Sequence, residues 1–88
     1  MKLKYRFEKM EIDGEIVAVP VGENAAELHA VLNLNEVAMH ILELLDENTT
    51  EENIVAQLLL EYAGDKTAIQ QAVHAFIDQV RQEGFLDE

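Results

Sequence analysis

The chain has 88 residues, 49% of them hydrophobic, and it contains no cysteine. A chain of this length has room for one modest core, so we expect a single domain over residues 1–88, and the lack of cysteine excludes disulfides and thiolate metal sites. Eighteen acidic residues against six basic ones give a formal net charge of −12 at pH 7, which disfavours nucleic acid as a partner.

The distribution of charge also bears on partners and location. Four of the six basic residues lie before Met10, so only Lys66 and Arg81 face the carboxylates of the remaining chain. An acidic surface favours a basic protein or peptide partner and disfavours anionic membrane, although the same charge also serves simply to keep a small domain soluble. No stretch approaches the roughly 20 apolar residues that span a bilayer, and the N-terminus lacks the apolar region of a signal peptide. We therefore expect a soluble, cytoplasmic protein.

The first 21 residues have the pattern of a β-hairpin. Up to Glu8, charged residues alternate with the apolar residues Leu3, Tyr5 and Phe7. The phase then slips by one residue, as a β-bulge would produce. Asp13-Gly14 is a two-residue turn signal because a type I′ turn requires positive φ at both positions. Residues 16–21 then form the apolar return strand, and a short third strand is predicted at Leu28–Leu32.

From Asn35 onward the apolar period changes to 3.6 residues, which predicts helices. Asn35 is suited to cap the first helix, because its side-chain oxygen can accept a free backbone N–H. The apolar face of this helix consists of Val37, Ile41, Leu44 and Leu45. The second helix begins with Thr49 or Thr50 as its cap and ends before Gly64, the expected C′ residue. Its predicted buried face is Ile54, Leu58, Leu59 and Tyr62.

The third and longest helix begins at Asp65 or Thr67 and ends at Gly84. Its apolar stripe is Ile69, Val73, Phe76, Ile77 and Val80. Phe85-Leu86 is then expected to fold back on the core. Three strands followed by three helices predict an α+β domain of winged-helix-like arrangement. Its three-stranded antiparallel sheet would consist of the N-terminal hairpin and the short third strand, followed by a three-helix bundle.

No group of residues in the sequence is suited to catalysis or to metal binding. The three histidines, His29, His40 and His74, lie in different elements without the i, i+4 spacing of a helical zinc site. The chain has no serine, and its three threonines stand where helix caps are expected, so no activated nucleophile is predicted. The glycines are dispersed rather than clustered in a phosphate-binding loop. We therefore expect no catalytic residue, no metal site and no cofactor, and a role in binding.

Two binding surfaces follow from this order of elements. A winged helix can bind DNA, but the third helix carries only Lys66 and Arg81 as cations, at opposite ends, which leaves little charge to hold phosphates. The other surface is a groove beside the third helix, along the flank that carries Ala68, Ala72, Ala75 and Gln79. If Leu28–Leu32 is an edge strand, an extended peptide could pair with it there by β-strand addition. Alternatively, the alanines are ordinary helix formers and packing closes the groove.

Residues 16–45 have a recognisable succession of motifs. The run IVAVPVGENAAELHAVLNLNEVAMHILELL contains a strand ending in V-x-V, a polar loop, a short strand and L-N-x-x-A leading into an apolar helix. Thr49–Val55 has a matching second-helix entry, and Gly84–Leu86 a matching tail. In this order and spacing the motifs resemble the PqqD-like family, named for a pyrroloquinoline quinone biosynthesis protein. Val37 departs from the pattern, since the family often has threonine there.

The resemblance implies a peptide-recognition module that is not itself an enzyme. Members bind the leader segment of a ribosomally synthesised precursor peptide as an added strand and present the peptide to a modifying enzyme, often a radical SAM protein. Carried over by position, the strand side of the site falls on Leu28, His29, Ala30, Val31 and Leu32. The helix side falls on Ala72, Ala75, Phe76 and Gln79, with Ala68 on the same flank. A winged-helix DNA-binding regulator and a self-associating domain that forms a homodimer through its edge strand remain open alternatives.

Overall fold

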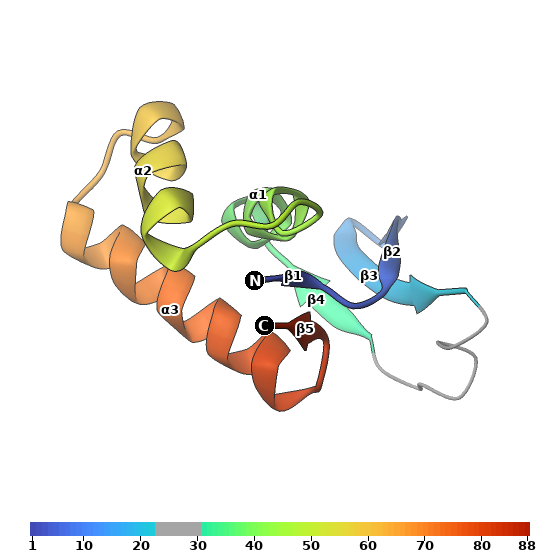
Figure 1. Cartoon of the computed structure of the whole chain (residues 1–88). Helices are drawn as coiled ribbons and strands as arrows, with labels where there is room; N and C mark the ends of the chain where they lie inside the picture. Colours follow the sequence, from blue (N-terminus) through green and yellow to red (C-terminus); the bar gives the residue numbers. More distant parts are fainter. Residues whose placement is uncertain (23–30) are drawn as a thin grey trace.

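The computed structural model describes residues 1–22 and 31–88, and within them the chain forms five strands and three helices. Figure 1 shows α1 between the hairpin and the pair formed by α2 and α3, with the two termini close together. The predicted α+β class, an antiparallel hairpin with a short third strand and three packed helices, is confirmed. The elements are β1 (Lys2–Leu3), β2 (Arg6–Ile12), β3 (Glu15–Val21), β4 (Leu32–Leu34), α1 (Glu36–Leu44), α2 (Glu51–Glu61), α3 (Lys66–Gln82) and β5 (Leu86–Asp87).

The hairpin forms around the predicted turn but without the predicted bulge. Asp13 and Gly14 have φ values of 52° and 82°, the positive values that a type I′ turn requires. The β2–β3 register runs without interruption from Arg6↔Val21 to Ile12↔Glu15, so the bulge prediction is wrong. Because the alternation continues unbroken, Met10 and Ile12 lie on the face opposite Phe7 and stay 43% and 52% exposed.

The third strand lies later in the chain than predicted. β4 pairs antiparallel with β3 in the register Ile16↔Leu34, Val17↔Asn33 and Ala18↔Leu32. Of the predicted range 28–32, Leu32 is in β4 and Val31 precedes it, 58% exposed, while Leu28, His29 and Ala30 lie outside the described residues. The physical reason is the alternation Leu32-Asn33-Leu34, which buries both leucines on the core face and leaves Asn33 exposed.

Each helix begins at a cap that the sequence indicated. Asn35 Oδ1 accepts the Ala38 N–H at 2.7 Å, Thr50 Oγ1 accepts that of Asn53 at 3.1 Å, and Asp65 caps α3. Thr50 is thus the cap of α2 rather than Thr49. The C′ assignment of Gly64 is wrong, since α2 already ends at the extended Tyr62.

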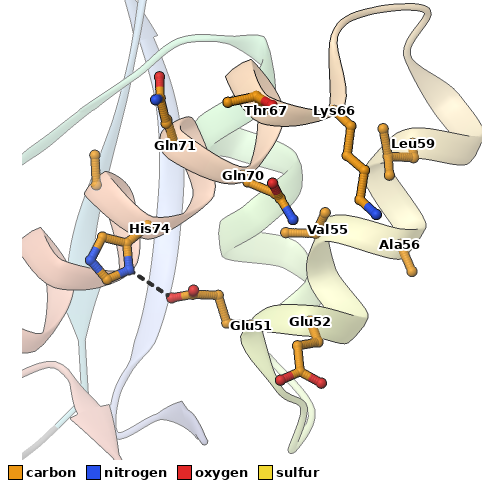
Figure 2. A pocket seen from close by; sticks show the side chains of 11 residues that line it. Glu51, Glu52, Val55, Ala56, Leu59, Lys66, Thr67, Gln70, Gln71 and His74 are labelled. Carbon is orange, nitrogen blue, oxygen red and sulfur yellow. Dashed lines mark hydrogen bonds and ion pairs between the residues drawn. The ribbon is translucent and has the colours of Figure 1, made fainter.

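The helices pack around one core and face the sheet. α2 and α3 run in opposite directions, and Glu51 at the start of α2 reaches His74 in the middle of α3, with 3.2 Å between Oε1 and Nδ1 (Figure 2). Their fully buried side chains are Ile54 and Leu58 from α2, and Val73, Ile77 and Val80 from α3. Across the described ranges, no helix has the length and apolar character to cross a membrane.

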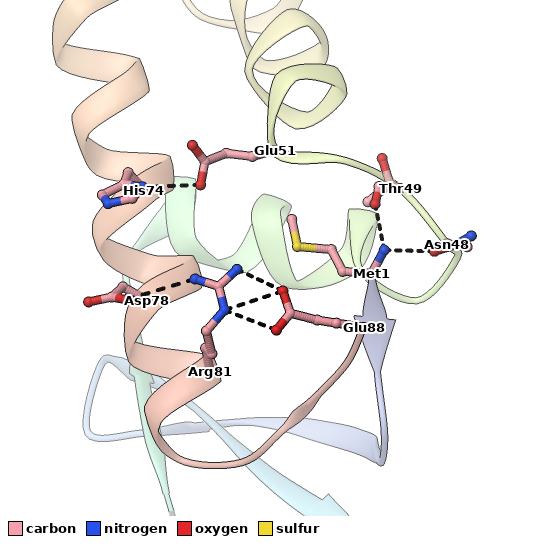
Figure 3. A network of polar contacts seen from close by, with 8 residues as sticks. All are labelled: Met1, Asn48, Thr49, Glu51, His74, Asp78, Arg81 and Glu88. Carbon is pink, nitrogen blue, oxygen red and sulfur yellow. Dashed lines mark hydrogen bonds and ion pairs between the residues drawn. The ribbon is translucent and has the colours of Figure 1, made fainter.

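The two ends of the chain close the core together. The prediction that the hairpin includes the first residues is wrong, because β1 is not part of it. β1 pairs antiparallel with β5, with Lys2 opposite Asp87 and Leu3 opposite Leu86. The Met1 ammonium donates to Asn48 Oδ1 at 2.7 Å, and the guanidinium of Arg81 holds Glu88 at 2.8 Å (Figure 3). The sequence-based prediction that residues 85–86 fold back is confirmed, because the Phe85 ring is completely buried.

Candidate functional site

A groove of about 590 Å³ lies where α3 faces β4, α1 and the end of α2. All five α3 residues predicted for the site, Ala68, Ala72, Ala75, Phe76 and Gln79, line this groove. The other lining residues are Asn33, Asn35, Val37, Ala38, Ile41, Leu58, Tyr62, Ala63, Gly64, Asp65 and Ile69. Four elements that are separate in the sequence therefore meet at one hollow.

The α3 wall is open because its side chains are small. Ala68, Ala72 and Ala75 recur at three- and four-residue spacing, so they lie on one side of the helix, and all three are exposed. Phe76, on the same wall, is only 8% exposed and forms the floor with the core behind it. Packing does not close the groove, since the alanines lack the atoms to fill it.

β4 contributes Asn33 to the groove, whereas Val31 and Leu32, predicted for the site, are not among its lining residues. It is the last strand in the order β2-β3-β4, and within the described ranges no strand pairs with its outer edge. An edge strand has backbone N–H and C=O groups free to pair with another chain. Leu32 is 3% exposed, so its side chain belongs to the core and only its backbone is available to a ligand. Among the predicted strand-side residues, Val31 is exposed, and Leu28, His29 and Ala30 are outside the described ranges.

Tyr62 and His40 make a polar contact at the groove that the sequence did not indicate. The Tyr62 hydroxyl lies 2.9 Å from His40 Nδ1, and the same nitrogen lies 2.9 Å from Glu61 Oε2. Partial burial raises the pKa of the Tyr62 phenol, and the carboxylates of Glu36, Glu61 and Glu43 raise it further. The contact with His40 holds the Tyr62 ring in place beside the groove.

Sequence reasoning placed Tyr62 on the buried face of α2, and it assigned no role at the groove to α1. The i, i+4 pair Val37 and Ile41 also lines the groove, and that spacing is the one signal that could have placed α1 beside it. In the described part of the chain, the lining contains one carboxylate, Asp65, and no lysine or arginine. The groove thus offers a largely apolar surface beside a backbone edge.

Among the described residues, the groove lining does not bring together the groups of a reaction centre. It includes no histidine, cysteine or serine from these residues. In residues 1–22 and 31–88 no three histidine, cysteine or acidic side chains gather closely enough to hold a metal ion. What the arrangement can do is hold an extended chain, through the β4 edge on one side and the alanine wall on the other.

Comparison with known proteins identifies a family and relatives of the same fold. The family model of coenzyme PQQ synthesis protein D (PqqD) matches residues 15–86. The solved structure of TbiB1 in complex with the TbiA(beta) leader peptide is 23% identical with a TM-score of 0.72, covering 99% of this chain and 95% of that one. Lasso peptide synthetase B1 complexed with the leader peptide is 16% identical with a TM-score of 0.68, covering 97% and 96%. Both establish a shared fold. No match was found among curated proteins.

Proposed function

This chain belongs to the coenzyme PQQ synthesis protein D (PqqD) family, and we propose that it binds the leader segment of a ribosomally synthesised precursor peptide and presents the peptide to a separate modifying enzyme. The observation that carries the proposal is the open groove between the β4 edge and the alanine wall of α3. Both structural neighbours were solved with leader peptides bound, which supports a peptide as the occupant.

The leader would bind as an added strand along β4. Backbone hydrogen bonds to Val31 and the β4 residues would give affinity, and leader side chains directed at Ala68, Ala72 and Ala75 would give selectivity. The short β4, with three residues, limits the number of such bonds. The wall of small side chains leaves room for bulkier leader residues, with Phe76 beneath them and Gln79 available for a polar contact.

The module would act without catalysing a reaction. A bound leader places the rest of the precursor at high effective concentration near the active site of the partner, which raises the rate of modification there. The family resemblance favours a radical SAM enzyme as that partner. Among the described residues, the groove lining contains no serine, cysteine or histidine that could serve as an activated nucleophile or its partner, which supports a role in binding.

The experiment that tests the proposal is an NMR titration of isotopically labelled protein with the leader portion of any short precursor peptide encoded nearby. We expect amide shifts concentrated at Leu32–Leu34 and along Ala68–Gln79, with a scrambled leader as the control. Shifts confined to other surfaces would overturn the assignment of the groove. If no leader binds and the mass in solution rises with protein concentration, the free β4 edge pairs two copies of the chain instead.

A further inference from the structure

A second hollow, of about 610 Å³, lies between α2 and α3 on the side of α3 away from the groove. Figure 2 shows side chains of both helices directed toward it. Its lining consists of Glu51, Glu52, Val55, Ala56, Leu59, Lys66, Thr67, Gln70, Gln71, His74 and Ala75. The proposed function makes no use of this hollow.

The hollow has an apolar base, and its two ends carry opposite charge. Its base is formed by Val55, Ala56, Leu59 and Ala75. Glu51 and Glu52 mark the end where α2 begins, whereas Lys66 lies at the other end, where α3 begins (Figure 2). Leu60 stands one helical turn beyond Ala56 and is 82% exposed, so it extends the apolar surface along α2.

The two hollows can be filled at the same time. Of the α3 residues, only Ala75 lines both. The remaining α3 residues of the second hollow alternate along the helix with those of the groove; they are Lys66, Thr67, Gln70, Gln71 and His74. A ligand in one hollow therefore leaves the other accessible, which is the arrangement that an adaptor between two partners requires.

We propose that the α2–α3 hollow is the docking site of the modifying enzyme, and that it takes a basic amphipathic segment of that enzyme. This inference rests on the proposed function. Apolar side chains of the segment fill the base over Val55 and Ala56, and its lysine or arginine side chains meet Glu51 and Glu52. The lone cation Lys66 at the opposite end fixes the direction of the segment, because a basic residue there would be repelled.

Charge selects this occupant over a second copy of the chain. Two copies each carry a net charge of −12, so pairing their acidic rims is opposed by repulsion. The negative charge of this protein attracts a basic segment, which raises the rate of association and favours this partner over acidic ones. The apolar base then supplies the contact that holds the complex once it has formed.

The test is the substitution Ala56→Arg, which adds a long cation to the apolar α2 residues that line the hollow. Ala56 is exposed within α2, and arginine is a good helix former, so we expect the variant to fold. The matched control is Gln57→Arg, which makes the same change of charge at the neighbouring exposed position, on the α1 side of α2. The two probes are the leader peptide and the purified enzyme that modifies the corresponding precursor, each titrated against wild type and both variants.

We expect Ala56→Arg to weaken binding of the enzyme by at least about tenfold, because the cation disrupts apolar packing on α2 and repels a basic segment, while its affinity for the leader is unchanged. The Gln57→Arg control should bind both probes as the wild type does. Enzyme binding that survives Ala56→Arg, or that falls equally in both variants, overturns the docking site while leaving the proposed function intact. Failure of the wild type to bind the leader removes the proposed function, and this inference with it.

Discussion

Filling the groove at its centre should abolish much of the affinity for a leader peptide. Ala72 lies in the middle of the α3 wall, between Ala68 and Gln79, which are eleven residues apart. At about 1.5 Å per residue the wall is about 16 Å long. An extended chain advances about 3.3 Å per residue, so about five leader residues lie along it. Because side chains alternate, two or three of them point at the helix.

The substitution Ala72→Trp would occupy the space of at least one of these leader side chains. Burial of one aliphatic side chain contributes about 1.5–3 kcal/mol. Since each 1.4 kcal/mol or so changes affinity tenfold, the dissociation constant should rise by about 10- to 100-fold. Calorimetric titration with the leader measures this change directly.

The control for this variant is Gln71→Trp. Gln71 is the neighbouring exposed residue, but it faces the α2–α3 hollow rather than the groove. Alanine and glutamine are both good helix formers, so the two substitutions cost the helix similar amounts. If Ala72→Trp folds with the stability of the control and still binds the leader like the wild type, the reasoning that places the peptide against α3 is refuted.

Three further predictions concern stability and electrostatics. Asn35→Ala should lower the free energy of unfolding by about 1 kcal/mol in urea titrations, whereas Asn35→Asp, which keeps the cap, should not. Phe85→Ala should cost about 3–5 kcal/mol by the same measurement, because the ring is fully buried; a smaller loss would contradict its place in the core. Hydrogen bonds from Arg81 hold the pKa of the Glu88 carboxyl below the usual 4.5. The ion pair therefore contributes to folding stability above the unfolded-state pKa of Glu88, and this stabilisation disappears as pH falls through the folded-state pKa. The stability difference between wild type and Glu88→Gln should therefore vanish in acid, and a difference that persists there would contradict the ion pair.

The features that could be predicted from the sequence depend on residues close together in the chain. Asp13-Gly14 forms the turn because only two backbone positions must adopt positive φ. The caps at Asn35 and Asp65 likewise need a side chain and an amide two or three residues away. The α3 wall could be predicted too, since the rigid geometry of a helix fixes which residues share a side.

The features that were missed depend on pairing between distant segments. β1 at the N-terminus pairs with β5 at the C-terminus, which places Lys2 opposite Asp87. No local pattern at either end of the sequence indicates this pairing. The phase slip after Glu8 suggested a bulge, but the register set by the turn simply leaves Met10 exposed. Similarly, Tyr62 meets His40 only because α1 packs on α2, an arrangement that helix periodicity cannot specify.

Strand addition can be tested most directly on the backbone of the leader itself. Along an added strand, successive N–H groups point alternately toward β4 and away from it. Methylation of one backbone nitrogen at a time removes one donor without changing any side chain. Each N–H that bonds to β4 should contribute about 0.5–1.5 kcal/mol, so we predict affinity losses at every second position opposite Leu32–Leu34 and little effect between them. Equal losses at consecutive positions, or none at all, would contradict a leader bound as a strand on β4.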